Sequence, residues 1–282
     1  NIIPLLGIMA LAAQKILPSM QSVFQGITGI RSNSAYVEDV FKTIAIKNKA
    51  LITTSKRLKF KNRIEIKDLY FKYSDESYNL LNGININLKQ GDHLGIIGKS
   101  GCGKSTLIDI FMGLIPPDEG RIIIDGKVLD IKNNYHNLNY WQSIITHVPQ
   151  SIFLIDGSIL ENIAFGIKKE EINLNKIREV VKLSKIEELI NNLEFGINTK
   201  VGERGVFLSG GQIQRIGIAR ALYKEAQILI LDEATSALDT ATEKSLISSI
   251  HGLKNKMTLI TITHRLSTLE KCDQVIELKK GK

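Results

Sequence analysis

The first part of the chain shows the hydrophobic pattern of a helix. Residues 2–13 form an apolar run of 12 residues without a charged side chain. This run is too short to cross a bilayer, since about 20 residues are needed at 1.5 Å per residue. It also lacks the basic leading region and cleavage site of a signal peptide. We interpret it as the cytoplasmic end of a transmembrane helix whose beginning lies upstream. A buried helix of a soluble core is the alternative.

Apolar residues recur three and four positions apart from Gln14 to about Ala50, which predicts an amphipathic helical extension. The stretch between Gly26 and Asn33 contains several weak helix formers, so we expect the helix to break there. Residues 51–62 are basic and show no period, which indicates a linker.

After Arg63 the pattern changes to short apolar runs that predict β-strands. These runs occupy residues 64–66, 69–71, 84–88, 94–97, 121–126, 228–231 and 259–262. The last two are continuously apolar, which is typical of strands buried in a parallel sheet. Residues 170–193 combine helical spacing with many charges, which predicts a surface helical subdomain. Strands that alternate with helices predict an α/β fold.

Composition excludes several classes of protein and then raises a question about charge. With 43% hydrophobic and 23% charged residues, the chain is neither disordered nor collagen-like, and two cysteines cannot form a disulfide framework. The net charge of +8 would ordinarily suggest nucleic acid as a partner. Residues 42–72, however, hold ten basic and two acidic side chains, while the other 251 residues balance at 27 of each. The excess therefore indicates a solvated linker, or one that faces acidic partner loops, beside the membrane segment.

A glycine-rich motif carries the strongest chemical signal. It fits the phosphate-loop (Walker A) pattern G-x-x-x-x-G-K-[ST] and consists of Gly98, Lys99, Ser100, Gly101, Cys102, Gly103, Lys104, Ser105 and Thr106. The motif follows the apolar run 94–97 and precedes a helical run, as a strand–loop–helix phosphate site requires. Its glycines let backbone N–H groups surround a phosphate, and the helix start adds positive potential. We therefore expect Lys104 to reach the β- and γ-phosphates and Ser105 to bind Mg²⁺.

The apolar run 228–231 ends in two adjacent carboxylates, Asp232 and Glu233 (Walker B). Because side chains alternate along a strand, we expect the two to point to opposite faces and to take different roles. In phosphoryl transfer, Asp232 would hold the Mg²⁺ ion and Glu233 would act on the attacking water. Alone, such a pair is more often a solvated turn. The phosphate loop upstream favours the catalytic interpretation.

A third motif supports a family resemblance. Residues 208–212 read Leu-Ser-Gly-Gly-Gln and precede Gln214-Arg215 and Ala219-Arg220-Ala221. This segment resembles the signature sequence of the ATP-binding cassette (ABC) transporters, and the resemblance runs from about Arg63 to the end of the chain. It implies a RecA-like P-loop NTPase core with an antiparallel β subdomain and a helical signature subdomain.

The resemblance also implies a division of the chain. Residues 63–282 would form the nucleotide-binding domain, with its helical subdomain at about 152–225 and its last hairpin truncated at the C-terminus. Residues 1–50 would be the end of the last transmembrane helix with its helical extension, a membrane-domain remnant, and residues 51–62 the basic linker.

Further roles follow from the resemblance, residue by residue. Tyr73 resembles the aromatic residue that stacks on adenine, and Gln150 the glutamine that senses Mg²⁺ and couples to the membrane domain. His264 resembles the switch histidine that contacts the γ-phosphate, and Asp239 belongs to a segment similar to the loop that crosses between cassettes. Together with Lys104, Glu233 and His264 are the candidate catalytic residues, and Ser105, Gln150 and Asp232 are the candidate metal ligands.

The signature segment predicts how two cassettes assemble. Ser209, Gly210, Gly211 and Gln212 lie at the start of a helix expected over 212–222, where a hydroxyl, backbone N–H groups and a positive helix end are available. A second phosphate-facing surface is useful if two chains sandwich ATP head to tail, as in the family. With an intact Glu233, the chain resembles half of a homodimer with two competent sites.

The resemblance is closest to exporters. Residues 202–205 resemble the segment with which exporters touch their partner's cytoplasmic loops, and the fused helical lead-in fits an exporter half-transporter. This implies an ATPase that uses ATP and Mg²⁺ in the cell (inner) membrane, with its cassette on the cytoplasmic side and its own transmembrane domain as a partner. The lead-in has a weaker likeness to flippases of lipid-linked oligosaccharides and polysaccharides.

Alternatives at this point are an exporter of peptides or small molecules and a soluble ABC ATPase that acts on nucleic acid or ribosomes. Soluble proteins of that kind typically carry two cassettes or a long coiled coil, and they would leave the apolar run 2–13 unexplained. We therefore expect no nucleic-acid partner. The intact Glu233 and His264 argue against a cassette that only binds ATP.

Overall fold

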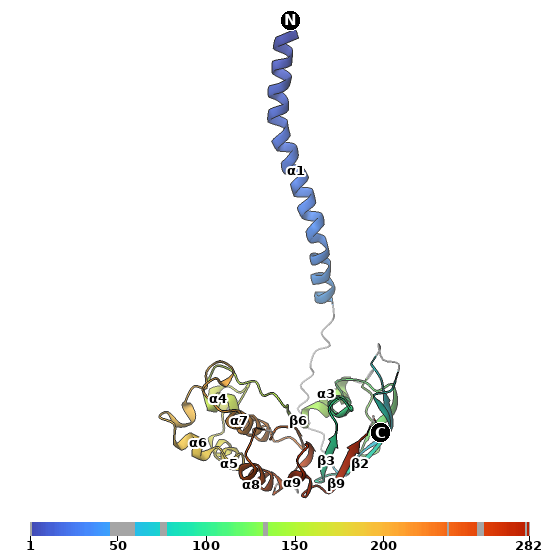
Figure 1. Cartoon of the computed structure of the whole chain (residues 1–282), viewed down its shortest axis with the longest axis vertical. Coiled ribbons are helices and arrows are strands. Elements are labelled where there is room, and N and C mark those ends of the chain that lie inside the picture. The colour runs from blue at the N-terminus through green and yellow to red at the C-terminus, as the bar shows by residue number, and fades with distance from the viewer. Residues whose placement is uncertain are drawn as a thin grey trace. The chain divides into compact units, whose positions relative to one another are not determined.

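The computed structural model describes residues 2–45, 60–73, 78–131, 135–235, 237–252, 257–279 and 281. The chain divides into two units, residues 1–51 and 52–282 (Figure 1). The last residues of the predicted extension, most of the predicted linker and Ser236 of the predicted crossing loop lie outside the described residues.

The described residues of the first unit form one long helix, α1 (Ile2–Ala45). The predicted break between Gly26 and Asn33 is wrong, because α1 runs through this segment. A glycine inside a helix costs only about 1 kcal/mol, and polar side chains here bond within the helix, as Asn33 Nδ2 does with the Gly29 carbonyl at 2.9 Å. An 18-residue window of α1 has a mean hydropathy of 1.6. By length and composition, the helix can therefore cross a membrane.

The second unit is built on two β-sheets. Among the described residues, one is an antiparallel sheet in the order β2-β1-β4-β5 and the other a parallel sheet in the order β6-β7-β8-β3-β9. The strands are β1 (Arg63–Phe71), β2 (Leu81–Lys89), β3 (His93–Gly98), β4 (Glu119–Ile124), β5 (Lys127–Val128), β6 (Ile145–Val148), β7 (Ile228–Asp232), β8 (Thr258–Ile262) and β9 (Gln274–Leu278). The predicted apolar runs lie in these strands, except that the run 121–126 continues into the turn after β4. The α/β fold class is confirmed.

The sequence did not predict β6 or β9. β6 is only four residues long and includes Thr146 and His147, so no apolar run marks it. β9 lies at the edge of the parallel sheet, and four of its five residues are at least partly exposed. An edge strand that buries so little carries no strong hydrophobic pattern.

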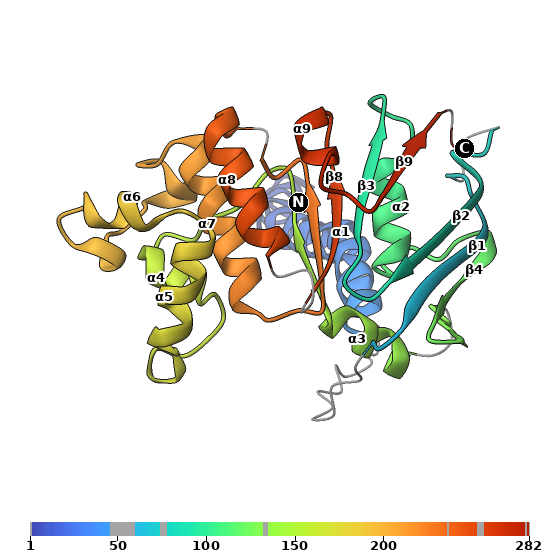
Figure 2. The ribbon, with the colours of Figure 1, turned by 90° about the horizontal axis from the view of Figure 1, so that it is seen from below.

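Helices fill the connections between the strands. They are α2 (Lys104–Phe111), α3 (Tyr135–Ser143), α4 (Ile159–Ile163), α5 (Leu174–Leu183), α6 (Glu187–Asn191), α7 (Gly210–Tyr223), α8 (Thr240–His251) and α9 (Leu266–Leu269), with 3₁₀ turns η1 (Lys169–Glu171), η2 (Gly196–Asn198) and η3 (Glu203–Gly205). Helices α4 to α7 follow one another between β6 and β7 and gather on one side of the second unit (Figure 2). The charged helical segment predicted at 170–193 contains α5 and α6.

Two hydrophobic cores meet at the parallel sheet. Helix α2 lies between the two sheets (Figure 2), and its buried residues join the core that contains Ile228 and Ile230 of β7. Leu229 and Leu231 of the same strand belong to the second core, with α7 and α8. Side chains that alternate along a strand point to opposite faces, so both faces of β7 are buried. This burial explains the continuous apolar run and fixes the carboxylates that follow it.

Candidate functional site

The phosphate loop connects the end of β3 to the start of α2, and its glycines are required by the close approach of neighbours. A Cβ atom on Gly98 would lie 2.5 Å from Cys102 Sγ and 2.7 Å from the Leu278 carbonyl oxygen. Gly103 has φ 99°, and a Cβ atom there would lie 2.8 Å from Leu81 Cδ2. Gly101, with φ 77°, has open space beside its Cα atom. The loop therefore packs tightly against neighbouring segments of the second unit and keeps one side open.

Lys104 begins α2 and turns its ammonium group back over this loop. The Nζ atom donates to the carbonyl oxygens of Gly98 at 2.7 Å and Lys99 at 3.0 Å. The residue is only 8% exposed. A buried cation that is held by neutral carbonyls gains strongly from a nearby anion. The loop therefore fits a phosphate group.

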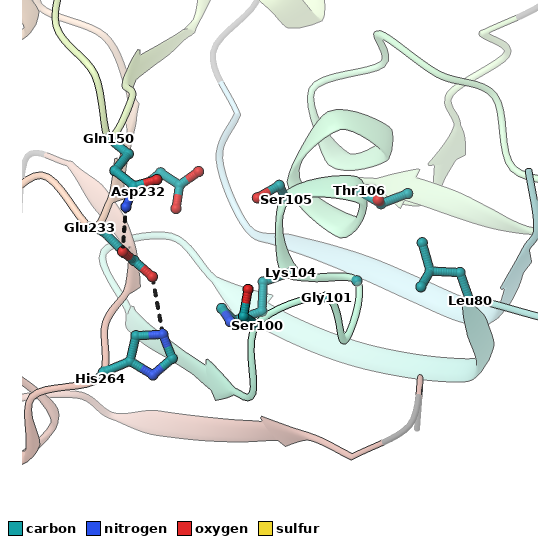
Figure 3. Close-up of a pocket in the computed structure, with 11 residues that line it drawn as sticks. Leu80, Ser100, Gly101, Lys104, Ser105, Thr106, Gln150, Asp232, Glu233 and His264 are labelled. Carbon is teal, nitrogen blue, oxygen red and sulfur yellow. Dashed lines mark hydrogen bonds and ion pairs between the residues drawn. The ribbon is translucent and has the colours of Figure 1, made fainter.

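A cavity of about 410 Å³ opens at the carboxyl end of the parallel sheet, between this loop and the ends of β6, β7 and β8 (Figure 3). Its lining consists of Leu80, Ser100, Gly101, Gly103, Lys104, Ser105, Thr106, Gln150, Asp232, Glu233 and His264. Ten of these eleven residues are ones that the sequence singled out. Ligands commonly bind at this edge of an open α/β sheet, because the loops that follow parallel strands converge there.

Glu233 is the centre of a small hydrogen-bonded group in the cavity. Gln150 Nε2 donates to Glu233 Oε2 at 2.8 Å, and His264 Nε2 lies 3.0 Å from Oε1 (Figure 3). Glu233 has φ 48°, a conformation that residues other than glycine rarely adopt. Such strain is typical of functional sites. Both carboxylate oxygens are therefore held in place at the cavity.

The predicted orientation of the acidic pair is wrong. Asp232 and Glu233 line the same cavity instead of pointing to opposite faces. The physical reason is that β7 ends at Asp232, and the left-handed backbone of Glu233 interrupts the alternation of side chains. The two carboxylates share the cavity but differ in their surroundings.

Burial raises the pKa of the Asp232 carboxyl group above its ordinary value, and the charges of Glu233 and Asp109 raise it further. His147 and Lys104 act in the opposite direction. A charged carboxylate in such surroundings is costly and gains from a cation. Among the described residues, no group of three or more His, Cys, Asp or Glu side chains could hold a metal ion. One carboxylate with a hydroxyl such as that of Ser105 instead fits Mg²⁺, which keeps waters and binds substrate phosphates.

Tyr73 lies beside the phosphate loop but outside the lining of the cavity. Its hydroxyl group is 3.3 Å from Thr106 Oγ1, and its ring packs edge-on against Phe71. Leu80, which sequence reasoning missed, lines the cavity instead. The strand β2 begins at the next residue, so the only available signal was that Leu80 is apolar and directly precedes an apolar strand.

The signature residues also lie outside this cavity, at the start of α7. Ser209 caps the helix, since its Oγ atom accepts from Gln212 N at 3.3 Å, and Gln212 Oε1 accepts from Ser209 N at 2.8 Å. Gly211 approaches the Ala237 carbonyl so closely that a Cβ atom would lie 3.1 Å from its oxygen. The structure thus presents Ser209 and Gly210 on an exposed helix end.

Asp239 has a clear local role as the N-cap of α8. Its Oδ1 atom accepts from Ala241 N at 3.1 Å and Thr242 N at 2.9 Å. Hydrogen bonds from Thr242 hold the pKa of this carboxyl group below its ordinary value. The carboxylate therefore fixes the direction in which the preceding loop enters the helix.

Comparison with known proteins agrees with this geometry. The profile of the ABC transporter family matches residues 81–236, from the start of β2 to beyond Glu233. The chain belongs to the ABC transporter family. The cassette resemblance drawn from the signature motif is thereby confirmed.

Relatives of this ABC protein are export proteins and flippases, among others. The heterocyst differentiation ATP-binding protein HepA of Nostoc is 36% identical over 271 residues, which are 95% of this chain and 43% of that protein. An ATP-dependent lipid A-core flippase of Cupriavidus pinatubonensis is 37% identical over 214 residues, 75% of this chain and 35% of the flippase. The chain thus spans less than half the length of these relatives.

A solved structure of a bacterial Atm1-family ABC exporter with ATP bound is similar to the chain, with a TM-score of 0.76 and 33% sequence identity. The similarity covers 89% of this chain and 43% of the exporter. It therefore includes the fold of the cassette that carries the cavity.

Proposed function

We propose that the chain is the ATP-hydrolysing part of a membrane exporter and that ATP binds in the cavity at the edge of the parallel sheet. The observation that carries the proposal is the hydrogen-bonded group of Gln150, Glu233 and His264 at a cavity that the phosphate loop also lines. A fixed carboxylate opposite a phosphate-binding loop is what hydrolysis of a phosphoanhydride requires, because the attacking water must be oriented beside the phosphate.

The residues of the phosphate loop bind the nucleotide. Gly98 to Thr106 surround the phosphates with backbone N–H groups, and the ammonium group of Lys104 neutralises the β- and γ-phosphates. Ser105 and Asp232 hold Mg²⁺, with Gln150 beside them. Bound Mg²⁺ supplies positive charge that stabilises the phosphate oxygens during the reaction.

Glu233 orients the attacking water and accepts its proton. His264 contacts the γ-phosphate and, through its contact with Oε1, keeps the carboxylate of Glu233 in the correct direction. Gln150 supports the other oxygen. Tyr73 stacks on the adenine ring from its place beside Thr106.

A second cassette completes the site. Ser209, Gly210, Gly211 and Gln212 lie outside the cavity of their own chain, where the exposed start of α7 is free to reach phosphate across an interface. We propose a head-to-tail homodimer in which each chain gives its phosphate loop to one site and its signature residues to the other. Asp239, at the entrance of α8, then communicates between the two sites.

Export of a lipid or lipid-linked saccharide is the substrate class that the relatives favour, since lipid A-core flippases are among them. An exporter of peptides or small molecules is the alternative. The long apolar α1 supports a place in the inner membrane. Residues 1–50 would then be the cytoplasmic end of the last transmembrane helix with its extension, 51–62 the linker and 63–282 the cytoplasmic cassette. The named relatives give no support to a soluble ATPase acting on nucleic acid.

Substitution of the catalytic carboxylate tests the proposal. The full chain, purified in detergent, should release phosphate from ATP in the presence of Mg²⁺. Glu233→Gln keeps the shape of the side chain but cannot accept the proton, so turnover should fall about 100-fold or more while ATP still binds. Glu225→Gln, which changes only a surface ion pair with Lys176, is the matched control. Hydrolysis that persists in Glu233→Gln refutes the role of Glu233, and wild-type chain that does not bind ATP refutes the proposed function.

A further inference from the structure

A buried carboxylate behind the cavity joins segments that are distant in sequence. Glu243 lies in the first turn of α8 and is 1% exposed. Its Oε1 atom accepts from Thr235 Oγ1 at 2.8 Å and from Thr268 Oγ1 at 3.1 Å. Its Oε2 atom accepts from Arg265 Nη1 at 2.6 Å. One carboxylate thus binds the segment after β7, the segment after β8 and helix α9.

Two of these donors lie next to the candidate catalytic residues. Thr235 follows Glu233 by two positions, and Arg265 follows His264 directly. Because neighbouring residues of a chain move together, a fixed Thr235 and a fixed Arg265 restrict where Glu233 and His264 can lie. The 3.0 Å contact between Glu233 and His264 connects the same two segments that Glu243 joins.

Arg265 extends the connection to the loop before α8. Its Nη1 atom also donates to the Leu238 carbonyl oxygen at 3.1 Å, and Leu238 N in turn donates to the Thr235 carbonyl at 3.1 Å. Leu238 directly precedes Asp239, the proposed contact between cassettes. The guanidinium group therefore ties the segment after β8 to the loop that leads into α8.

Burial makes this arrangement stiff. A carboxylate that is withdrawn from water is costly unless charged and polar donors satisfy it. Here a guanidinium group and two hydroxyl groups do so, and Thr235 and Thr268 are themselves almost fully buried. Displacing any of the joined segments would leave part of the carboxylate unpaired inside the protein. The segments therefore shift together or not at all.

We propose that Glu243 is a positioning residue for ATP hydrolysis. It does not line the cavity. It acts through Arg265 and Thr268 on the segment of His264, and through Thr235 on the segment of Glu233, and so holds the two segments at their working separation. The proposal rests on the proposed function, because it concerns the efficiency of the same site. A purely structural role would instead make Glu243 important for stability alone.

The Glu243→Gln substitution distinguishes a positioning role in hydrolysis from a purely structural role. The amide keeps the size of the side chain and retains one oxygen, which can face either Arg265 or the threonine hydroxyl groups. The charge that holds Arg265 is lost in both orientations. Because a misplacement of about 1 Å costs on the order of 100-fold in rate, we expect kcat for hydrolysis of MgATP to fall about tenfold or more. The KM for ATP should stay within about threefold, since the phosphate loop is unchanged.

The measurement compares kcat, KM and thermal unfolding of the full chain, with Glu225→Gln as a matched control on a surface ion pair. A variant that is less stable but turns over ATP at the wild-type rate well below its unfolding temperature refutes the proposal. Wild-type chain without MgATPase activity contradicts the proposed function instead, so the two failures are distinguishable.

A double-mutant cycle tests the path through Arg265. If Glu243 acts through this residue, Arg265→Ala should lower kcat as well, and the combined variant should be no slower than the worse single variant. Full additivity of the two losses refutes this path.

If the Glu243→Gln variant does not fold, Thr268→Val provides a second test of the proposal. Valine has nearly the same shape as threonine and removes only the hydrogen bond to Oε1. We expect a fall in kcat of about threefold with an unchanged KM, because the ion pair remains. A folded Thr268→Val variant with wild-type kcat refutes the proposal.

Discussion

His264 Nε2 lies 3.0 Å from Glu233 Oε1, although 31 positions separate the two residues in the sequence. The register of two parallel strands produces this contact. Asp232 of β7 pairs with Ile262 of β8, and Glu233 N donates to the Ile262 carbonyl oxygen at 3.0 Å. The chain therefore leaves both strands at the same point of the sheet edge. The His264 side chain is 53% exposed and that of Glu233 23%, so the carboxylate is the more enclosed partner.

Removal of this imidazole should impair turnover and not binding. In His264→Ala, Glu233 loses one of its two orienting contacts, and the γ-phosphate loses a donor. We expect phosphate release to fall about 100-fold, a typical cost of removing one such group, with little change in ATP binding. His251→Gln, at the end of α8 and outside the cavity lining, is the matched control. Turnover of His264→Ala within about threefold of wild type contradicts the assigned role.

Asp232→Asn should stabilise the fold while it strongly lowers MgATPase activity. Burial raises the folded-state pKa of the Asp232 carboxyl group above its ordinary value of 3.8. Folding therefore binds protons in the pH range between 3.8 and the raised pKa. The contribution of this group to folding stability falls as the pH rises through that range. Above that range the ionised carboxylate is a constant cost, which asparagine removes. At pH 7.5 we expect the unfolding temperature to rise by about 2 °C, and MgATPase activity to fall about 100-fold or more.

The control for this measurement is Asp156→Asn, which changes an exposed aspartate. Its unfolding temperature should match that of wild type. A lower unfolding temperature for Asp232→Asn than for wild type at pH 7.5 contradicts the prediction, because it means that the ionised carboxylate is favourable in the folded state.

Tyr73 should contribute its ring and not its hydroxyl group to nucleotide binding. The hydroxyl contact with Thr106 is long at 3.3 Å, so Tyr73→Phe should keep the KM for ATP near wild type. Tyr73→Ala removes the stacking surface and should raise KM about tenfold, since stacking on a base is worth about 1–3 kcal/mol. Tyr78→Ala, an exposed tyrosine, is the control. If Leu80→Ala raises KM and Tyr73→Ala does not, the base lies against Leu80 instead.

Ser209 and Ser158 offer a matched pair of helix caps. Each serine starts a helix in a capping box, Ser209 with Gln212 and Ser158 with Glu161. Alanine at either position should cost about 1 kcal/mol of stability by loss of the cap. Only Ser209→Ala should also lower MgATPase activity, by about tenfold, because only Ser209 is proposed to reach the phosphates of a partner chain. Equal activity of the two variants removes the support for a trans contact.

Much of the site could be predicted because its parts are local. The phosphate loop requires glycine at positions where a Cβ atom would collide, and such positions leave a readable pattern at Gly98 and Gly103. The helix expected over 212–222 is α7, which begins two residues earlier under the cap of Ser209. The apolar run 228–231 lies within β7, because both faces of that strand are buried.

Three features were predicted wrongly or missed, each for a physical reason. The weak helix formers between Gly26 and Asn33 predicted a break in α1. The prediction did not include the hydrogen bonds that their side chains make along the helix. Sequence reasoning placed Asp232 and Glu233 on opposite faces, because it could not know where β7 ends. It missed Leu80, whose neighbours in the cavity come from distant segments.

The sequence by itself determined the pieces: a strand, a glycine loop and a helix for phosphate, a capped helix at the signature, and a buried strand that ends in carboxylates. These follow from backbone and side-chain preferences that act within a few residues. Only the tertiary structure decided that Gln150 and His264 both contact Glu233, and that Glu243 joins Thr235, Arg265 and Thr268. Those contacts span up to 83 positions and arise from strand register and packing, which no short stretch of sequence contains.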